Sequence, residues 1–196
     1  MTRGFVSNVG IRQRIKAVVL ALILLVLPLP VEDRMPLNDL DLLRKLITEH
    51  PDRGNLPVEL VMAICRQESS LNDWHFYRPE PAYRWLVGNP TEPKEIIGQK
   101  SSWGPMQVMG ATARELGFTG EFSELFDYAT GIKYGMLYLR KLNQRYDNWP
   151  DVISAYNAGH VKRVDGKYAN QVKYVDPVLR YWNELETHIE LKGTEV

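Results

Sequence analysis

The chain has 196 residues, of which 44% are hydrophobic and 24% are charged, so it has room for one globular domain and a short appendage. Its formal net charge is zero, and residues 32–196 hold 20 basic against 24 acidic residues, which argues against a nucleic-acid-binding protein. A single cysteine, Cys65, excludes an internal disulfide framework.

Residues 1–31 have the pattern of an export segment. Four basic residues, the last of them Lys16, precede an uncharged run that extends from Ala17 to Val31. The run is shorter than the roughly 20 residues that span a bilayer comfortably, and no small-residue cleavage site follows it. We therefore expect a signal peptide or an uncleaved signal anchor, which places residues 32–196 on the periplasmic or cell-wall side of the cytoplasmic membrane. The alternative, a buried helix, is disfavoured because no polar residue interrupts the run.

Helices are predicted along most of the remaining chain. The first spans about 40–47, with a cap near Asn38 or Asp39, and the second begins at Pro57 with Asn55 as a possible cap. Further helices are predicted at 112–116, 123–146, 152–158 and from about 171 to 185. In the helix at 123–146, Gly131 and Gly135 allow close approach of a neighbour. Clear strands are absent from the pattern, so the predicted class is mainly α.

A carboxylate lies in an unusual place near the end of the second helix. Leu60, Val61, Ile64 and Cys65 form an apolar stripe, and Glu68 falls on that same stripe. Burial and the negative end of the helix dipole both disfavour its ionised form, which raises its pKa towards the range of a general acid. The alternative is a partly exposed glutamate at a fraying helix end, which pairs with Arg66 or is simply solvated.

The segment from Leu71 to Ser102 is predicted to be a long loop. It is rich in proline and aromatic residues, and a loop of this length inside a domain is usually functional. Its largest aromatic side chains are Trp74, Phe76, Tyr77, Tyr83 and Trp85.

Three short motifs occur in order along the chain: Glu68-Ser69, then Gly104-Pro105-Met106-Gln107, then Ala155-Tyr156-Asn157-Ala158-Gly159. With them the chain resembles the lytic transglycosylase family, which has the lysozyme-like fold, an α+β superfamily with little strand. The resemblance covers roughly residues 56–185, and it includes Thr112-Ala113, 131–139 and Tyr174-Val175. It implies a single catalytic domain at 32–196.

The resemblance implies a role for each matched residue. Glu68 would be the sole catalytic carboxylate, first acid and then base. Substrate binding would involve Ser69, Met106, Gln107, Tyr156, Asn157 and Tyr174. Ser69 would either hold the sugar or fix the surroundings of Glu68. Met106 and Gln107 would line the cleft, and the Tyr156 phenol would orient either the carboxyl or the N-acetyl group of the sugar. The alternatives are a helix cap for Ser69, a core position for Tyr156 and a helix end for Asn157.

The chain departs from the family pattern in three places. Pro105 replaces the usual leucine or methionine of the Gly-Leu-Met-Gln turn, which stiffens the turn and removes one donor. The segment between Glu68 and Gly104 is much longer than the short form of the family. At 170–175 the tyrosine and valine are kept, but the acid and arginine that often precede them are missing.

The implied function is cleavage of the β-1,4 bond between N-acetylmuramic acid and N-acetylglucosamine in peptidoglycan. Since the matched motifs supply only Glu68, we expect the substrate's own hydroxyl to act as nucleophile and to give a 1,6-anhydromuramic product. A goose-type lysozyme, which uses water, and a non-catalytic wall-binding component are the alternatives. No metal or organic cofactor is implied, the partner is the glycan strand, and we expect a monomer. The aromatic loop is expected to form part of the glycan cleft.

Overall fold

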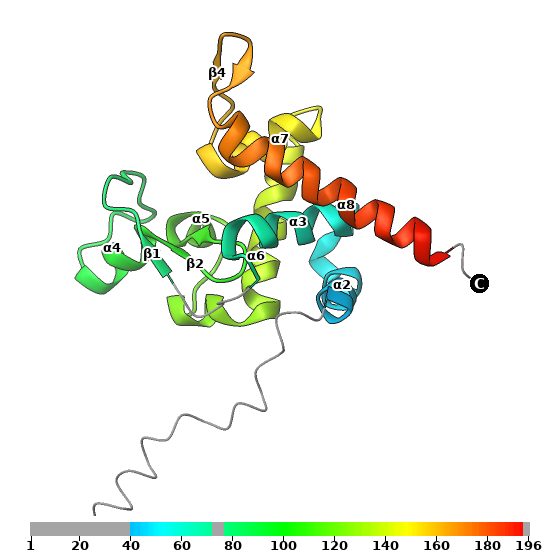
Figure 1. Cartoon of the computed structure of the whole chain (residues 1–196). Helices are drawn as coiled ribbons and strands as arrows, with labels where there is room; N and C mark the ends of the chain where they lie inside the picture. Colours follow the sequence, from blue (N-terminus) through cyan, green and yellow to red (C-terminus); the bar gives the residue numbers. More distant parts are fainter. Residues whose placement is uncertain (1–39, 72–76, 194–196) are drawn as a thin grey trace, which may run out of the picture. The chain divides into compact units, whose positions relative to one another are not determined.

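The computed structural model describes residues 40–71 and 77–193, and the side chains up to residue 187 (Figure 1). The expected export segment, the caps proposed at Asn38 and Asp39, and Trp74 and Phe76 lie outside the described residues. In the described ranges, no helix is long and apolar enough to cross a membrane.

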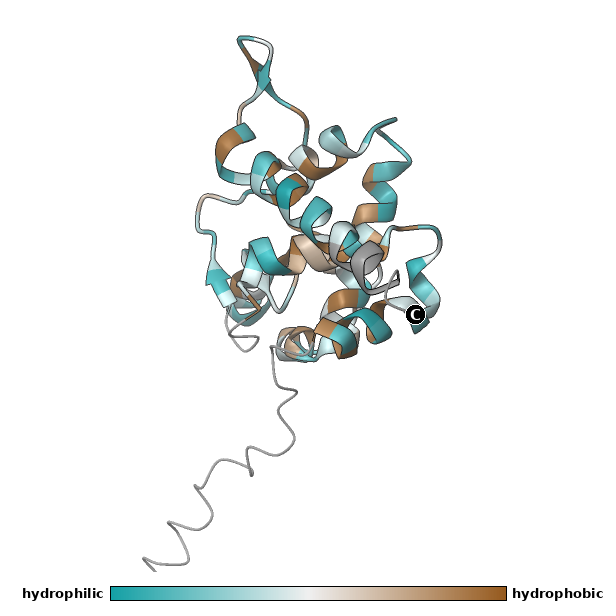
Figure 2. Ribbon diagram, turned by 45° about the vertical axis from the view of Figure 1, so that its right-hand side comes forward, coloured by the Kyte–Doolittle hydropathy of each residue, from teal (hydrophilic) through white to brown (hydrophobic). Residues whose placement is uncertain are grey.

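Helices make up most of the described chain, as predicted. Their bounds are α2 (Leu40–Glu49), η2 (Pro51–Arg53), α3 (Val58–Ser69), α4 (Pro93–Gln99), α5 (Gly110–Glu115), η3 (Phe122–Phe126), α6 (Tyr128–Asn143), α7 (Trp149–Ala158), η4 (Gln171–Val175) and α8 (Asp176–Gly193). The long α8 packs along α3, and α6 packs against α7 and η3 (Figure 1). Hydrophobic residues gather between the helices, and hydrophilic residues cover their outer turns (Figure 2).

Helix α3 is buried more completely than its predicted single stripe implies. Six consecutive side chains, from Leu60 to Cys65, are at most 1% exposed. A helix that is apolar all round must be surrounded by other elements, and α2 and α8 pack against it. The predicted cap at Asn55 is wrong: the helix begins after Pro57, with no capping side chain, because the fixed φ of proline already suits a helix start.

Short strands are present that the sequence pattern does not reveal. Strands β1 (Tyr77–Pro79), β2 (Ser101–Trp103) and β3 (Val108–Met109) form an antiparallel sheet in the order β1-β2-β3. Tyr77 pairs with Trp103 across this sheet, and their rings stack with centroids 5.0 Å apart. Strands β4 (Arg163–Val164) and β5 (Lys167–Tyr168) form a hairpin that projects from the helices (Figure 1). The predicted loop at 71–102 is therefore partly wrong, because it contains β1, α4 and the start of β2.

The predicted helix at 123–146 is interrupted at Asp127. The preceding residues form η3, and Asp127 is extended, with its carboxylate accepting from the backbone N–H of Thr130 at 2.9 Å. Asp127 is thus the N-terminal cap of α6, a place where its carboxylate also suits the helix dipole. The predicted last helix begins at Gln171 as expected, but its first turn is the wider π-type turn η4.

The turn of Gly104 to Gln107 is pressed against η3 and α6, and the glycines of α6 permit the close approach of a neighbour that they predict. A Cβ at Gly104, which has φ of +69°, would lie 2.0 Å from the backbone oxygen of Leu125. A Cβ at Gly135 would lie 2.2 Å from the sulfur of Met106. Only glycine permits these approaches, so the turn takes a fixed position at the end of β2.

Candidate active site

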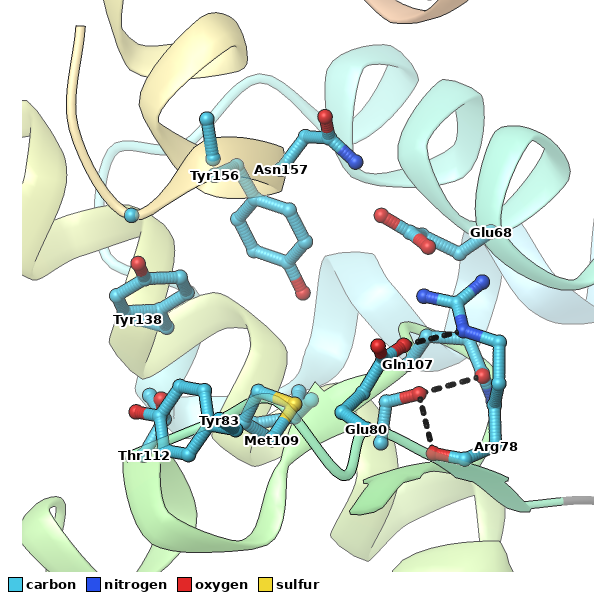
Figure 3. A pocket seen from close by; sticks show the side chains of 14 residues that line it. Glu68, Arg78, Glu80, Tyr83, Gln107, Met109, Thr112, Tyr138, Tyr156 and Asn157 are labelled. Atoms are coloured by element: carbon cyan, nitrogen blue, oxygen red, sulfur yellow. Dashed lines mark hydrogen bonds and ion pairs between the residues drawn. The ribbon is translucent and has the colours of Figure 1, made fainter. Parts of the chain in front are cut away.

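A pocket of about 420 Å³ lies where the ends of α3 and α7 face the small sheet (Figure 3). Its walls come from seven helices and strands, α3, β1, β2, β3, α5, α6 and α7, and from the segments that join them. The lining residues are Glu68, Arg78, Glu80, Tyr83, Ser102, Gln107, Val108, Met109, Thr112, Tyr138, Tyr156, Asn157, Ala158 and Gly159. We call this space the catalytic pocket, since it is where the predicted acid lies.

Glu68 occupies the last turn of α3 and is half-buried in one wall of the pocket (Figure 3). Burial raises the pKa of Glu68 from its ordinary value of 4.5 to about 7, against the lowering effect of a hydrogen bond from Tyr174 and of the Arg78 charge. The alternative pairing with Arg66 is absent, because Arg66 lies 3.5 Å from Glu184 instead. Glu68 can therefore hold a proton near neutral pH and release it during a reaction.

Tyr174 is the group that fixes the orientation of the Glu68 carboxyl. Its hydroxyl donates to Oε1 of Glu68 at 2.5 Å. Tyr174 is buried in η4, and that burial raises the pKa of its phenol well above the ordinary value, so it remains a neutral donor. The amide of Gln67 donates to the carbonyl of Lys173 at 3.3 Å and joins α3 to η4 beside this contact.

Gln107 lies on the pocket wall opposite Glu68, with a φ of +46° (Figure 3). Its amide nitrogen donates to the carbonyl of Gly104 at 2.9 Å, and its amide oxygen accepts from the hydroxyl of Ser102 at 3.0 Å. One donor and one acceptor position of the carboxamide remain for a ligand. Met106 is fully buried against Gly135, and its side chain is not brought to the pocket.

Tyr156 and Asn157 enter the pocket from the last turn of α7, which ends at Gly159 with φ of +76°. The Tyr156 hydroxyl donates to the carbonyl of Met106 at 2.9 Å. Because its one proton is used in this bond, the Tyr156 hydroxyl does not donate to the Glu68 carboxyl, which was one of its two predicted roles. The phenol oxygen can still accept a hydrogen bond from a ligand. The Asn157 side chain is exposed, and its oxygen accepts from Asn170 at 3.0 Å.

The family model of the transglycosylase SLT domain matches residues 45–175, about two thirds of the chain. The chain belongs to this family. No significant match was found among curated proteins or among solved structures. The mainly helical architecture with a few short strands agrees with the SLT domain and its lysozyme-like fold, and a role in peptidoglycan degradation follows from the family.

Ser69 has a place in this SLT domain that does not reach the ligand space. Its side chain is buried, and its hydroxyl donates to the carbonyl of Cys65 one turn earlier at 2.9 Å. The residue that ends α3 in the left-handed conformation is its neighbour Ser70, with φ of 55°. Ser69 thus secures the backbone of the turn that carries Glu68, which is in line with a role in fixing the surroundings of Glu68 and differs from a direct sugar contact and from the helix cap.

Arg78 and Glu80 are pocket residues that the sequence analysis did not assign. Nε of Arg78 donates to Oε1 of Glu80 at 2.6 Å, and both side chains face the pocket from the end of β1 (Figure 3). The only available signal was a pair of opposite charges two positions apart, with Arg78 in β1 and Glu80 just after it. Because no strand is predicted there, the sequence does not indicate that the two side chains face a pocket, and it predicts only a loop at Glu80.

The aromatic residues of the loop do not share one role in the SLT domain. Tyr77 stacks on Trp103 in the sheet, while Tyr83 lines the catalytic pocket. Trp85 is 79% exposed and lies beside the pocket rather than in it.

The residues that the structure describes hold no group of three His, Cys, Asp or Glu side chains that could bind a metal ion.

Proposed function

We propose that the chain is a lytic transglycosylase that cleaves the β-1,4 bond between N-acetylmuramic acid and N-acetylglucosamine and leaves a 1,6-anhydromuramic end. The observation that carries this proposal is the state of Glu68. Its carboxyl has a pKa of about 7, accepts a hydrogen bond from Tyr174 and has no ion-pair partner among the described residues. Such a group is suited to serve as acid and then as base within one reaction.

The proposed reaction proceeds in two proton transfers through the same carboxyl. Glu68 gives its proton to the bridging oxygen, the bond from that oxygen to C1 of the muramic acid breaks, and N-acetylglucosamine leaves with the proton. The hydroxyl of C6 then attacks C1 and returns its proton to Glu68. Because this nucleophile is already attached to the substrate, its effective concentration is high. Tyr174 stabilises the intermediate carboxylate through its 2.5 Å hydrogen bond.

Gln107, Tyr156 and Asn157 are proposed to bind the sugars on either side of the scissile bond. Each lines the catalytic pocket and retains hydrogen-bonding capacity, which suits the hydroxyl and N-acetyl groups of a glycan. Met106 and Ser69 are proposed to act indirectly, by supporting the Gln107 turn and the Glu68 turn respectively.

A goose-type lysozyme is the second candidate function, and the position of Glu80 favours it. Glu80 is a second carboxylate in the same pocket, and a hydrolase needs such a group to activate water. Against this role, Nε of Arg78 already donates to Oε1 of Glu80 at 2.6 Å, so one of the two carboxylate oxygens is engaged by Arg78 rather than by a water molecule. We therefore rank hydrolysis second.

The two carboxylates can be separated by paired amide variants. Release of soluble muropeptides from purified sacculi should be abolished in Glu68→Gln and retained within about threefold in Glu80→Gln, since loss of a general acid or base costs roughly 10²–10⁴ in rate. Equal loss in both variants would favour the hydrolase. If the wild-type chain binds sacculi but releases nothing, the chain is a wall-binding component.

We also propose that residues 1–31 anchor the enzyme in the cytoplasmic membrane, with the SLT domain on its outer side. The uncharged run after Lys16 and the lack of a cleavage site support this proposal. Cell fractionation should recover the whole chain with membranes at its intact mass. A soluble, shortened form would show instead that the segment is a cleaved signal peptide.

A further inference from the structure

A second hollow of about 880 Å³ lies next to the catalytic pocket. The two spaces share five residues of their walls: Tyr83, Thr112, Tyr138, Ala158 and Gly159. Beyond these shared residues, the second space is bounded by the segment 82–87 and by the outer side of α6. We call it the Trp85 groove, after the aromatic side chain on its rim. A ligand long enough to extend from Glu68 past the shared residue Tyr83 would reach this groove.

The segment that carries Trp85 is held by a buried hydrogen-bond network. Gln99, which is 1% exposed, accepts from the N–H of Val87 at 2.7 Å and donates to the Val87 carbonyl at 3.0 Å. Gln99 also donates to Glu95, which the Arg114 guanidinium holds at 2.8 and 2.9 Å. The segment therefore has a fixed position without any support from the Trp85 side chain.

Trp85 itself is 79% exposed, the largest exposed fraction of any large hydrophobic side chain in the described residues. A rigid loop that presents an indole to water at the edge of a groove provides a flat apolar surface. Sugar rings have C–H faces that pack on such surfaces, and an aromatic side chain adds binding energy at little entropic cost. The position suits a saccharide unit that follows the one at Glu68.

The groove also has an excess of positive charge. Its lining includes Arg84, Lys141 and Arg145 but only one acid, Glu115, which lies 2.5 Å from Lys141. Arg84 and Arg145 are both exposed and have no ion-pair partner within the part of the chain that the structure describes. A neutral oligosaccharide has no group that pairs with these two guanidinium groups. Their natural partners are carboxylates or phosphates.

We propose that the Trp85 groove binds a saccharide unit of the glycan strand together with the acidic peptide attached to it. The sugar packs on Trp85, and Arg84 and Arg145 bind carboxylates of the peptide. The inference rests on the proposed function, because it assumes that the strand passes Glu68. It adds that the enzyme distinguishes peptide-bearing strands from bare ones at a site next to the catalytic pocket.

The test measures binding with the whole chain carrying Glu68→Gln, so that the ligand is not consumed. Two ligands are compared: soluble peptidoglycan strands with their peptides, and the same strands after an amidase has removed the peptides and the muramic carboxylates freed by that hydrolysis have been blocked as neutral amides. Both are first cleared of phosphate-bearing wall polymers. In the double variant Arg84→Ala/Arg145→Ala, affinity for peptide-bearing strands should fall about tenfold, while affinity for bare strands stays within about twofold. The loss should shrink at high salt.

Two further variants locate the effect. Trp85→Ala should weaken both ligands equally, by about three- to tenfold, because stacking involves the sugar. Arg180→Ala is the matched control, since Arg180 is an exposed arginine that lines neither space, and it should leave both affinities unchanged. Thermal melting checks that each variant is folded.

Three outcomes would overturn the inference. The first is an equal loss for both ligands in the double arginine variant, and the second is no loss at all. The third is a Trp85→Ala variant that binds strands normally but loses self-association or binding to vesicles, which would make the rim a protein or membrane contact. Failure of the proposed function has a different signature, because the wild-type chain would then cleave neither ligand, whatever the binding contrast.

Discussion

Replacing Glu68 with glutamine should make the protein more stable at neutral and alkaline pH, while abolishing its activity. Burial raises the pKa of Glu68 from 4.5 to about 7, so the folded state disfavours the carboxylate that the unfolded chain readily forms. The stability that the neutral acid contributes is complete below pH 4.5 and is lost as the pH rises through about 7. The neutral amide does not ionise and avoids this loss.

The size of the effect follows from the same two values. The gap between 4.5 and about 7 corresponds to about 3 kcal/mol, at about 1.4 kcal/mol for each pH unit. Because the carboxyl opens to solvent in the pocket, we expect a smaller gain, about 1–2 kcal/mol. In a domain of this size, that gain raises the melting temperature by roughly 3–8 °C.

The assay is thermal unfolding of the wild-type and Glu68→Gln chains between pH 4 and pH 9. The difference in melting temperature should be near zero at pH 4, grow between about pH 4.5 and 7, and level off above that range. Glu80→Gln serves as the control, because Glu80 is an ion-paired glutamate of the same pocket. Parallel curves for wild type and Glu68→Gln would refute the claim that Glu68 is destabilised by burial.

Two further predictions concern residues that support the site. In Tyr174→Phe the loss of the hydrogen bond that favours the carboxylate should raise the pKa of Glu68 further. The alkaline limb of the pH–activity profile should therefore move upward by roughly one pH unit, and an unchanged limb would contradict this role. Gly104→Ala should cost about 2–4 kcal/mol in chemical denaturation, since its Cβ would meet a backbone oxygen at 2.0 Å in addition to a positive φ. Gly88→Ala, with a similar φ and open space, should cost about 1 kcal/mol or less, and equal losses would show that crowding is unimportant.

The sequence predicted the elements that have strong local signals. Helix α3 has a proline start and a long apolar run, and α7 ends at Gly159, where a positive φ favours glycine. The two glycines of α6 correctly indicated a close neighbour, although nothing local showed that this neighbour is the turn containing Met106. Strands of two or three residues are too short to produce an alternating pattern, so the sheet was missed.

The interactions around Glu68 depend on tertiary structure that local patterns do not encode. Tyr174 lies 106 positions from Glu68 in the chain, and a π-type turn brings its hydroxyl to the carboxyl. The motifs indicate that both residues belong to the site, but they do not indicate that Tyr174 contacts Glu68. Glu80 reaches the pocket only because β1 pairs with β2, and no property of its own segment indicates that pairing.

The most direct test of the central claim is the origin of the oxygen on C1 of the muramic product. Peptidoglycan is digested by the wild-type chain in ¹⁸O-labelled water, and the released muropeptides are examined by mass spectrometry before and after borohydride reduction. If the C6 hydroxyl is the nucleophile and Glu68 acts as both acid and base, the products have anhydro masses, resist reduction and carry no ¹⁸O. Reducible muramic ends that carry ¹⁸O would contradict the account and make Glu80 the first candidate for the base that activates water.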